Sequence, residues 1–183
     1  PVINLIGANP LIVECKAVFT DPGATATDTC DTNVAVNVTG SVDTNTVGEY
    51  TLTYTATDAS GNNADPVTRT VQVVDTTKPV ITIIGPNPYS LECHSIYSDP
   101  GATATDTCQG NVTVTNNAGT AVNANEPGDY TVTFTATDAN GNTATATRVV
   151  QVRDNLAPTV TIIGANPLTL QCGSTFNDPG ATA

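Results

Sequence analysis

Cysteine is the residue type with the clearest chemical potential in this sequence. The 183 residues contain five cysteines, at positions 15, 30, 93, 108 and 172. Two pairs are each 15 residues apart, no CxxC motif occurs, and the only histidine is His94, so a zinc site fits poorly. The spacing predicts two disulfides, Cys15–Cys30 and Cys93–Cys108, with free thiols as the alternative. Each bond would close a loop of about 15 residues and add about 3 kcal/mol of stability.

Cys172 has no neighbour at this spacing. We expect its partner about four residues beyond Ala183, supplied either by more of the same chain or by a neighbouring copy in a fibre. Regular disulfides also predict an oxidising compartment outside the cytoplasm.

Carboxylates and side-chain amides form the second group of candidate site residues. Hard cations such as Ca²⁺ bind several oxygen ligands at once. The candidate calcium ligands are Asp75, Asp106, Asp138, Asn140 and Asn142. The alternative for Asp138, as for Asp58, is that each opens a hairpin turn and bonds its own backbone. A further alternative is that these two carboxylates pair with Arg69 and Arg148.

The positions of these residues follow an internal repeat. The stretches "LIGANPLIVEC", "IIGPNPYSLEC" and "IIGANPLTLQC" align with a period of 78 or 79 residues, and "FTDPGATATDTC" recurs as "YSDPGATATDTC". We therefore expect repeat 1 at residues 1–75, a linker at 76–78, repeat 2 at 79–154, a linker at 155–157, and the N-terminal part of repeat 3 at 158–183.

Each repeat has the pattern of short β-strands. In "YTLTYTATD" the apolar side chains of Tyr50, Leu52, Tyr54 and Ala56 alternate with Thr, and Gly, Pro, Asn and Asp break the chain between such runs. Six or seven strands in about 78 residues, with no helical period, predict an all-β fold of tandem antiparallel β-sandwiches.

Composition excludes several classes of partner. Asp and Glu number 17 against 5 Lys and Arg, giving a net charge of -12, which disfavours binding to nucleic acids and to anionic membrane surfaces. No apolar run approaches the roughly 20 residues of a spanning helix, so we expect no membrane insertion in this segment.

No catalytic pattern is present. His94 is replaced by Lys16 and Gly173 in the other repeats, and phosphate-binding loops, HExxH and EF-hand motifs are absent, so we expect no enzyme and no required cofactor apart from a candidate Ca²⁺. Asp21 and Asp99 precede Pro-Gly and are interpreted as turn formers.

Two NVT motifs begin at Asn37 and Asn111 and are candidate N-glycosylation sites. The alternative is chance, because the chain is rich in both Asn and Thr.

Together, "VEC", "FTDPGATATDTC" and "GEYTLTYTATDASGN" resemble the immunoglobulin-like (Ig-like) tandem repeats of large bacterial surface proteins, akin to hyalin-repeat modules. The resemblance implies Ig-like sandwiches in an extracellular or cell-surface protein. In an Ig-like topology, the last strand of repeat 1 would end beside the loops of repeat 2 and bring the candidate calcium ligands together.

Two functions are compatible with such repeats. The first is a structural segment of a rod, stalk or filament, with one disulfide per repeat. The alternative is an adhesin-type module whose loops at one pole recognise a glycan or receptor. Recognition sites usually expose aromatic residues, and the chain has only five Tyr and three Phe, which favours the structural role.

Overall fold

The alternating Thr-rich stretches form the longest strands of the molecule. The computed structural model describes residues 1–183. In repeat 1 the strands are β1 (Val2–Leu5), β2 (Leu11–Glu14), β3 (Ala24–Thr27), β4 (Val36–Thr39), β5 (Gly48–Ala56) and β6 (Val67–Val74). The predicted alternation is confirmed in β5, where Leu52, Tyr54 and Ala56 are buried while the Thr side chains between them face outward.

Repeat 2 has the same order with one additional strand. Its elements are β7 (Val80–Ile83), β8 (Tyr89–Glu92), β9 (Ala102–Asp106), β10 (Gly110–Val112), β11 (Val114–Asn116), α1 (Ala118–Ala121), β12 (Gly128–Thr137) and β13 (Thr143–Arg153). The single helical turn, α1, was not expected from the sequence. No helix of the molecule is long and apolar enough to cross a membrane.

Two sheets face each other in each repeat. Repeat 1 packs the β1-β3 pair against the sheet β2-β6-β5-β4, and repeat 2 packs β10-β9-β7 against β11-β12-β13-β8. This arrangement confirms the predicted all-β fold. One pair in each repeat is parallel rather than antiparallel, namely β2 with β6 and β8 with β13. Both strands of such a pair therefore end at the same pole of the repeat.

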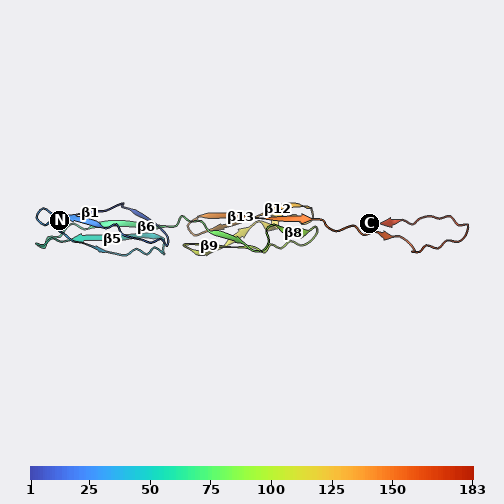
Figure 1. The fold of residues 1–183 in the computed structure, drawn as a ribbon, viewed down its shortest axis with the longest axis horizontal. Helices are drawn as coiled ribbons and strands as arrows, with labels where there is room; N and C mark the ends of the chain where they lie inside the picture. Colours follow the sequence, from blue (N-terminus) through green and yellow to red (C-terminus); the bar gives the residue numbers. More distant parts are fainter.

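The repeats lie end to end along one axis (Figure 1). The third unit contains only the hairpin of β14 (Thr161–Ile162) and β15 (Ala181–Thr182), and its side chains are exposed. Its pairing of Thr161 with Thr182 corresponds to that of Thr82 with Thr103 between β7 and β9.

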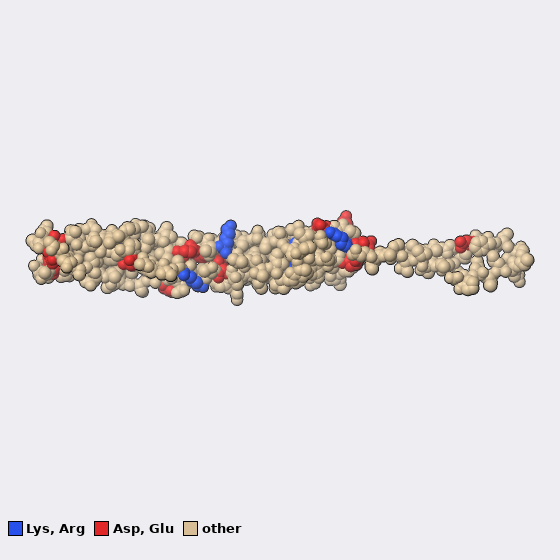
Figure 2. Space-filling model, viewed as in Figure 1, with Lys and Arg blue, Asp and Glu red and all other residues tan.

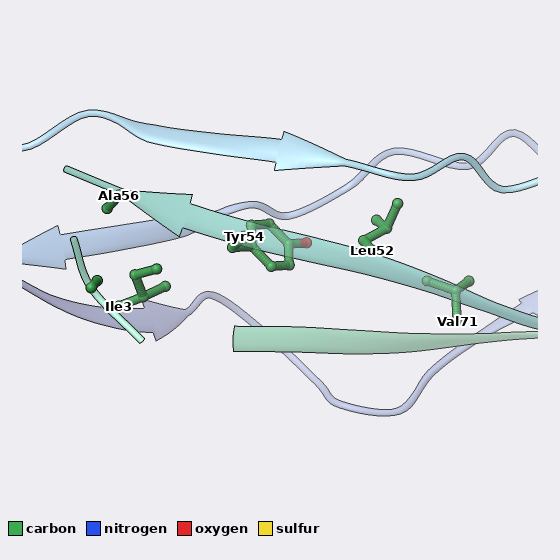
Figure 3. Close-up of a cluster of buried hydrophobic side chains, with 6 residues drawn as sticks. Ile3, Leu52, Tyr54, Ala56 and Val71 are labelled. Carbon is green, nitrogen blue, oxygen red and sulfur yellow. The ribbon is translucent and has the colours of Figure 1, made fainter. Parts of the chain in front are cut away.

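Each core is small and aliphatic with one buried aromatic ring. In repeat 1, the cluster of Ile3, Leu52, Tyr54, Ala56 and Val71 fills the space between the sheets (Figure 3). In repeat 2 the corresponding cluster contains Val132, Phe134, Val150 and Val152, all fully buried.

A buried ion pair lies beside each core. In repeat 1 the Arg69 guanidinium is fully buried, and its Nη1 is 2.6 Å from Asp21 Oδ1. In repeat 2, Arg148 Nη1 is 2.7 Å from Asp99 Oδ1. The suggested pairing of these arginines with Asp58 and Asp138 is therefore wrong, because both hairpin carboxylates bind backbone amides of their own turns.

The Pro-Gly turns position the carboxylates of these ion pairs. Gly23 has φ +80°, which an L side chain would rarely adopt, and its N–H donates to Asp21 Oδ1 over 3.0 Å. Asp21 is thus a turn former, as expected, and an ion-pair partner as well. The second role cannot be predicted from local sequence, because Arg69 lies 48 residues further along the chain.

Candidate functional site: the junction between repeats 1 and 2

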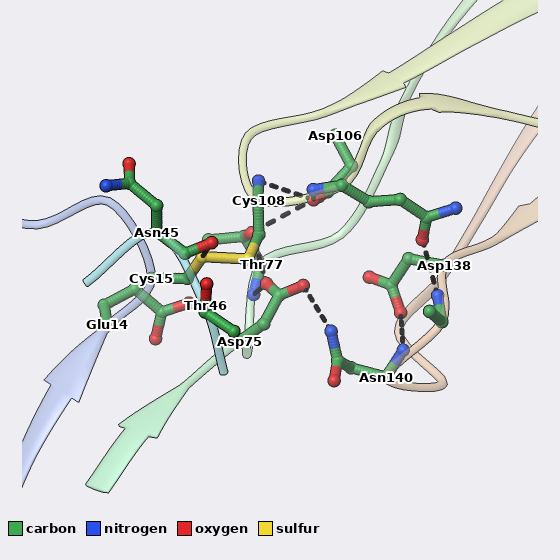
Figure 4. The surroundings of a disulfide bond; sticks show 12 residues. Glu14, Cys15, Asn45, Thr46, Asp75, Thr77, Asp106, Cys108, Asp138 and Asn140 are labelled. Carbon is green, nitrogen blue, oxygen red and sulfur yellow. Dashed lines mark hydrogen bonds between the residues drawn. A yellow bond between two sulfur atoms is a disulfide. The ribbon is translucent and has the colours of Figure 1, made fainter. Parts of the chain in front are cut away.

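Four segments meet at the boundary between repeats 1 and 2. Repeat 1 contributes the ends of the parallel strands β2 and β6, and the linker 76–78 follows directly. Repeat 2 contributes the turn after β9 and the hairpin turn between β12 and β13. Figure 4 shows these segments around one disulfide.

The disulfide joins Cys15 of repeat 1 to Cys108 of repeat 2. Its Cα atoms are 5.6 Å apart, within the normal range, and the two residues are 93 apart in sequence. Cys30 and Cys93 are free thiols. The predicted pairs Cys15–Cys30 and Cys93–Cys108 are therefore wrong, and the bond crosses the junction.

Strand direction explains why Cys15 pairs with Cys108 and not with Cys30. The parallel pairing of β2 with β6 places Cys15 at the pole where β6 ends, and the Cys15 N–H donates to the Val74 carbonyl over 2.7 Å. Strand β3 instead runs antiparallel to β1, so that Thr27 pairs with Val2 at the opposite pole. Cys30 follows at that far end and cannot reach Cys15, whereas Cys108 occupies the equivalent end of repeat 2, beside repeat 1.

The structure brings the three carboxylates predicted as calcium ligands together. One oxygen from each of Asp75, Asp106 and Asp138 lies within 4.8 Å of the other two. All three residues are buried, with exposed fractions of 6–8%. Asp75 ends repeat 1, Asp106 ends β9, and Asp138 opens the β12–β13 turn, so the cluster exists only where the two repeats meet.

The two predicted amide residues also lie in this cluster and connect the repeats. Asn140 Nδ2 donates to Asp75 Oδ2 over 2.8 Å. Asn142 Nδ2 donates to the Asp75 backbone carbonyl over 3.1 Å and to Asp138 Oδ2 over 2.9 Å. In these contacts both amides act as donors, so their side-chain oxygens are the atoms left to bind a cation.

The linker contributes contacts beyond those of the predicted site residues. Thr77 Oγ1 lies 2.9 Å from Asp75 Oδ1 and 3.3 Å from Asp106 Oδ2, between the two repeats. The Glu14 carboxylate accepts from both the N–H and the hydroxyl of Thr76, over 2.8 and 2.9 Å. A Thr two residues after an Asp is a common turn pattern, so the contact between Asp75 and Thr77 could have been predicted from the sequence.

No basic side chain forms an ion pair with the carboxylates of this cluster. The four ion pairs of the structure all lie elsewhere. Burial alone would raise the pKa of Asp138, but hydrogen bonds from Asn142 and Asn140 outweigh it and lower that pKa, so the carboxylate is ionised at neutral pH. Figure 2 shows acidic side chains gathered near the ends of the repeats, whereas the flanks on this face carry few charges.

The other predicted site residues lie apart from the junction or outside any complete unit. Asn37 is exposed on β4 and Asn111 is exposed on β10, each within a strand. Cys172 is exposed in the third unit and forms no bond. His94 is exposed, and its Nδ1 lies 3.2 Å from Asn125 Oδ1, with no nucleophile or carboxylate as partner.

Comparison with known proteins identifies the family of the two repeats. A family model described as "Bacterial surface protein, Ig-like domain" matches residues 3–73 and 81–152. Hyalin from Lytechinus variegatus is 35% identical over 176 residues, which cover 86% of this chain and 32% of hyalin. Internalin I from Listeria monocytogenes is 28% identical over 163 residues, covering 81% of this chain and 9% of internalin I.

A third relative is named "Serine-rich adhesin for platelets", from Staphylococcus aureus. It is 35% identical over 136 residues, which cover 65% of this chain and 10% of the adhesin. The chain spans about a third or less of the length of each of these relatives.

Proposed function

Because the chain belongs to the Ig-like domain family of bacterial surface proteins, we propose that it is a stiff, load-bearing spacer in a surface protein. Membership confirms the resemblance found in the sequence, and the relatives are extracellular or cell-surface proteins, as this chain is. The observation that carries the proposal is the disulfide between Cys15 and Cys108, which joins one repeat to the next.

A covalent bond across a short linker restricts how two domains can move. The linker alone already limits bending because it has three residues, and Glu14 holds Thr76 against repeat 1. The disulfide adds a second covalent connection at the same pole, and Asn140 and Asn142 add hydrogen bonds to Asp75. Two connections and a polar network fix one relative orientation of the repeats.

The same bond changes how the chain responds to a pulling force. Load applied at the two ends passes from Cys15 directly to Cys108, so the segment between them, a separation of 93 residues, does not extend. That segment would otherwise release about 300 Å of chain, at roughly 3.3–3.6 Å per residue. Most of repeat 1 is therefore protected from mechanical unfolding.

Small-angle X-ray scattering of the whole chain tests the stiffness. We expect a narrow distribution of distances between repeats 1 and 2 in the oxidised protein, and a broader one in Cys15→Ser and in Cys108→Ser alike. Cys30→Ser is the matched control, because Cys30 is exposed and free. Equal distributions in oxidised protein and Cys108→Ser would contradict the proposal.

We also propose that the carboxylate cluster at the junction binds Ca²⁺. Three buried carboxylates within 4.8 Å, with no basic partner, repel one another, and a divalent cation would remove that repulsion. Bound Ca²⁺ would stiffen the junction further, since Asp75 belongs to repeat 1 and the other two carboxylates to repeat 2.

Titration calorimetry and thermal unfolding test the calcium site. We expect heat of binding and a higher Tm with Ca²⁺, both lost in Asp106→Asn, because only ligand binding to the folded state raises Tm in this way. Asp65→Asn, at an exposed carboxylate with no hydrogen-bond partner, is the matched control. A wild-type chain whose Tm is the same in millimolar Ca²⁺ and in chelator would refute the site.

The adhesin-type alternative is supported by the name of the S. aureus relative. A hollow on the surface of repeat 2 is lined by Thr115, Asn116, Asn117, Thr133 and Thr135, all polar. It contains no aromatic ring on which a sugar could stack, and the structural role therefore remains our proposal. The relatives are surface or adhesin proteins, and none of them is named as an enzyme.

A further inference from the structure

The environment of the free thiol Cys93 reproduces that of the bonded Cys15. The Cys93 N–H donates to the Arg153 carbonyl over 2.7 Å, as the Cys15 N–H does to Val74. The residue after each cysteine has a left-handed backbone, with φ +60° at Lys16 and +63° at His94. The end of repeat 2 that points away from repeat 1 therefore carries a cysteine in the same backbone setting as Cys15 at the junction.

The linker after repeat 2 also begins as the first linker does. Glu92 accepts from the N–H and the side-chain amide of Asn155, over 2.8 and 3.0 Å, just as Glu14 binds Thr76. The Asp154 carboxylate accepts from Leu156 N–H two residues later, as Asp75 accepts from Thr77. The linker after repeat 2 thus makes the same hydrogen bonds to repeat 2 as the linker at 76–78 makes to repeat 1.

The second cysteine of each repeat, Cys30 or Cys108, also has the same backbone setting in both repeats. Cys108 N–H donates to Asp106 Oδ1 over 2.7 Å, and Cys30 N–H donates to Asp28 Oδ1 over 2.9 Å. In the third unit, the hairpin β14–β15 repeats the register of β7–β9, the strand pair that ends in the Cys108 turn. Cys172 is followed by the same tight turn, in which Ser174 N–H donates to the Gln171 carbonyl.

We propose that Cys93 forms a second inter-repeat disulfide with the cysteine that follows "ATATDT" in the next Ig-like repeat. Its partner would be the residue that corresponds to Cys108 in the unit that begins at 158. Bond formation joins the two Sγ atoms and releases two protons and two electrons. The electrons reduce a disulfide oxidant, which becomes two thiols.

Successive bonds of this kind overlap, and the overlap limits extension. Cys108 connects repeat 2 to repeat 1, and Cys93 would connect it to the following repeat. A pulling force would therefore pass through repeat 2 only along the 15 residues between these two cysteines. Fully extended, that segment measures about 50 Å, against about 270 Å for a whole repeat of 79 residues. This mechanical consequence rests on the proposed load-bearing function, whereas the bond itself does not.

Thiol mapping in the natural full-length protein tests the bond. Free thiols are alkylated without reductant, the protein is digested, and linked peptides are identified by mass spectrometry. We expect the Cys93 peptide to be linked to the corresponding peptide of the following repeat. In Cys93→Ser, the single newly alkylated thiol should be that cysteine of the following repeat. In the matched variant Cys15→Ser, it should be Cys108.

Three results would overturn the inference: a Cys93–Cys108 linked peptide, an alkylated Cys93 in the oxidised wild type, or a following repeat without cysteine at that position. Because linked peptides are read from wild-type protein, the test does not depend on the variants folding. A bond found by mapping together with a flexible junction in scattering would refute the spacer function alone, so the two failures can be distinguished.

Discussion

In repeat 1 the carboxylate of Asp21 accepts a hydrogen bond from the hydroxyl of Tyr54, which lies on the long central strand β5, over 2.7 Å. In repeat 2 the equivalent carboxylate, Asp99, accepts one from Tyr97, which lies only two residues away in the chain. The equivalent ion pair thus receives its tyrosine hydroxyl from a different part of the chain in each repeat.

The exchange is reciprocal. Where repeat 1 has Tyr54, repeat 2 has Phe134, and where repeat 2 has Tyr97, repeat 1 has Phe19. Both central rings are buried, and in each repeat the arginine of the ion pair lies 5.5 Å from the ring centroid. Each repeat therefore combines one buried ring, one partly buried ring and one hydroxyl on the carboxylate, and the two repeats place that hydroxyl at different positions.

Loss of the arginine should have the largest effect on this site. In Arg69→Ala, the Asp21 carboxylate loses its counter-ion in a partly buried setting, and we expect a loss of about 3–5 kcal/mol in the free energy of unfolding of repeat 1. Urea denaturation measures the total, and hydrogen exchange in β5 and β12 assigns it to one repeat.

Arg148→Ala should produce the same loss in repeat 2. The matched control is Arg153→Ala, because the pair Arg153–Asp129 is exposed and should contribute less than about 1 kcal/mol. If Arg69→Ala and Arg153→Ala had similar effects, the buried pairs could not be central to the fold.

Alkaline pH should destabilise both repeats through the two tyrosines. Burial, with the hydrogen bond to Asp21 as second cause, raises the pKa of Tyr54 to about 12, and burial with the bond to Asp99 raises that of Tyr97 likewise. Because the folded pKa exceeds the unfolded value of 10, the contribution is present below pH 10 and lost as the pH rises to about 12. Each tyrosine should account for about 2–3 kcal/mol.

Denaturation with urea across this pH range, after the free thiols have been blocked, measures the effect. Tyr54→Phe should remove the alkaline loss in repeat 1 and leave that in repeat 2 unchanged. A loss that persists in repeat 1 of this variant would show that groups other than Tyr54 cause it.

Much of the fold could be predicted from the sequence, because alternation and turn residues act locally. The Thr-rich strands, the repeat period and the inward parity of Leu52 and Tyr54 follow from side chains that succeed one another in the chain. The ion pairs could not be predicted in this way. Arg69 and Asp21 are 48 residues apart, and only the packing of one sheet on the other brings them together.

The junction was predicted in part for a similar reason. The cluster of Asp75, Asp106 and Asp138 followed from the expected topology, in which the end of one repeat meets the loops of the next. The disulfide pairing failed because it depends on strand direction. The sequence predicts a fully antiparallel sandwich, whereas β2 pairs with β6 in parallel, which places Cys15 at the pole that faces repeat 2.

The smallest expected effect tests whether the hydroxyl is truly interchangeable. Tyr54→Phe should lower the unfolding free energy by about 1.5 kcal/mol, the low end for a hydrogen bond to a charged group, because Asp21 keeps its bonds from Arg69 and Gly23. This is less than the alkaline loss, since phenylalanine leaves no charge beside the carboxylate.

The double variant Phe19→Tyr/Tyr54→Phe gives repeat 1 the arrangement of repeat 2. It should regain most of the lost stability, whereas Phe19→Tyr alone should gain little, because the carboxylate already has its hydroxyl. A double-mutant cycle in urea, with Tyr97→Phe/Phe134→Tyr as the reverse exchange in repeat 2, measures the coupling. If the double variant were no more stable than Tyr54→Phe, the two positions would not be equivalent donors, and the exchange between repeats would reflect ring packing alone.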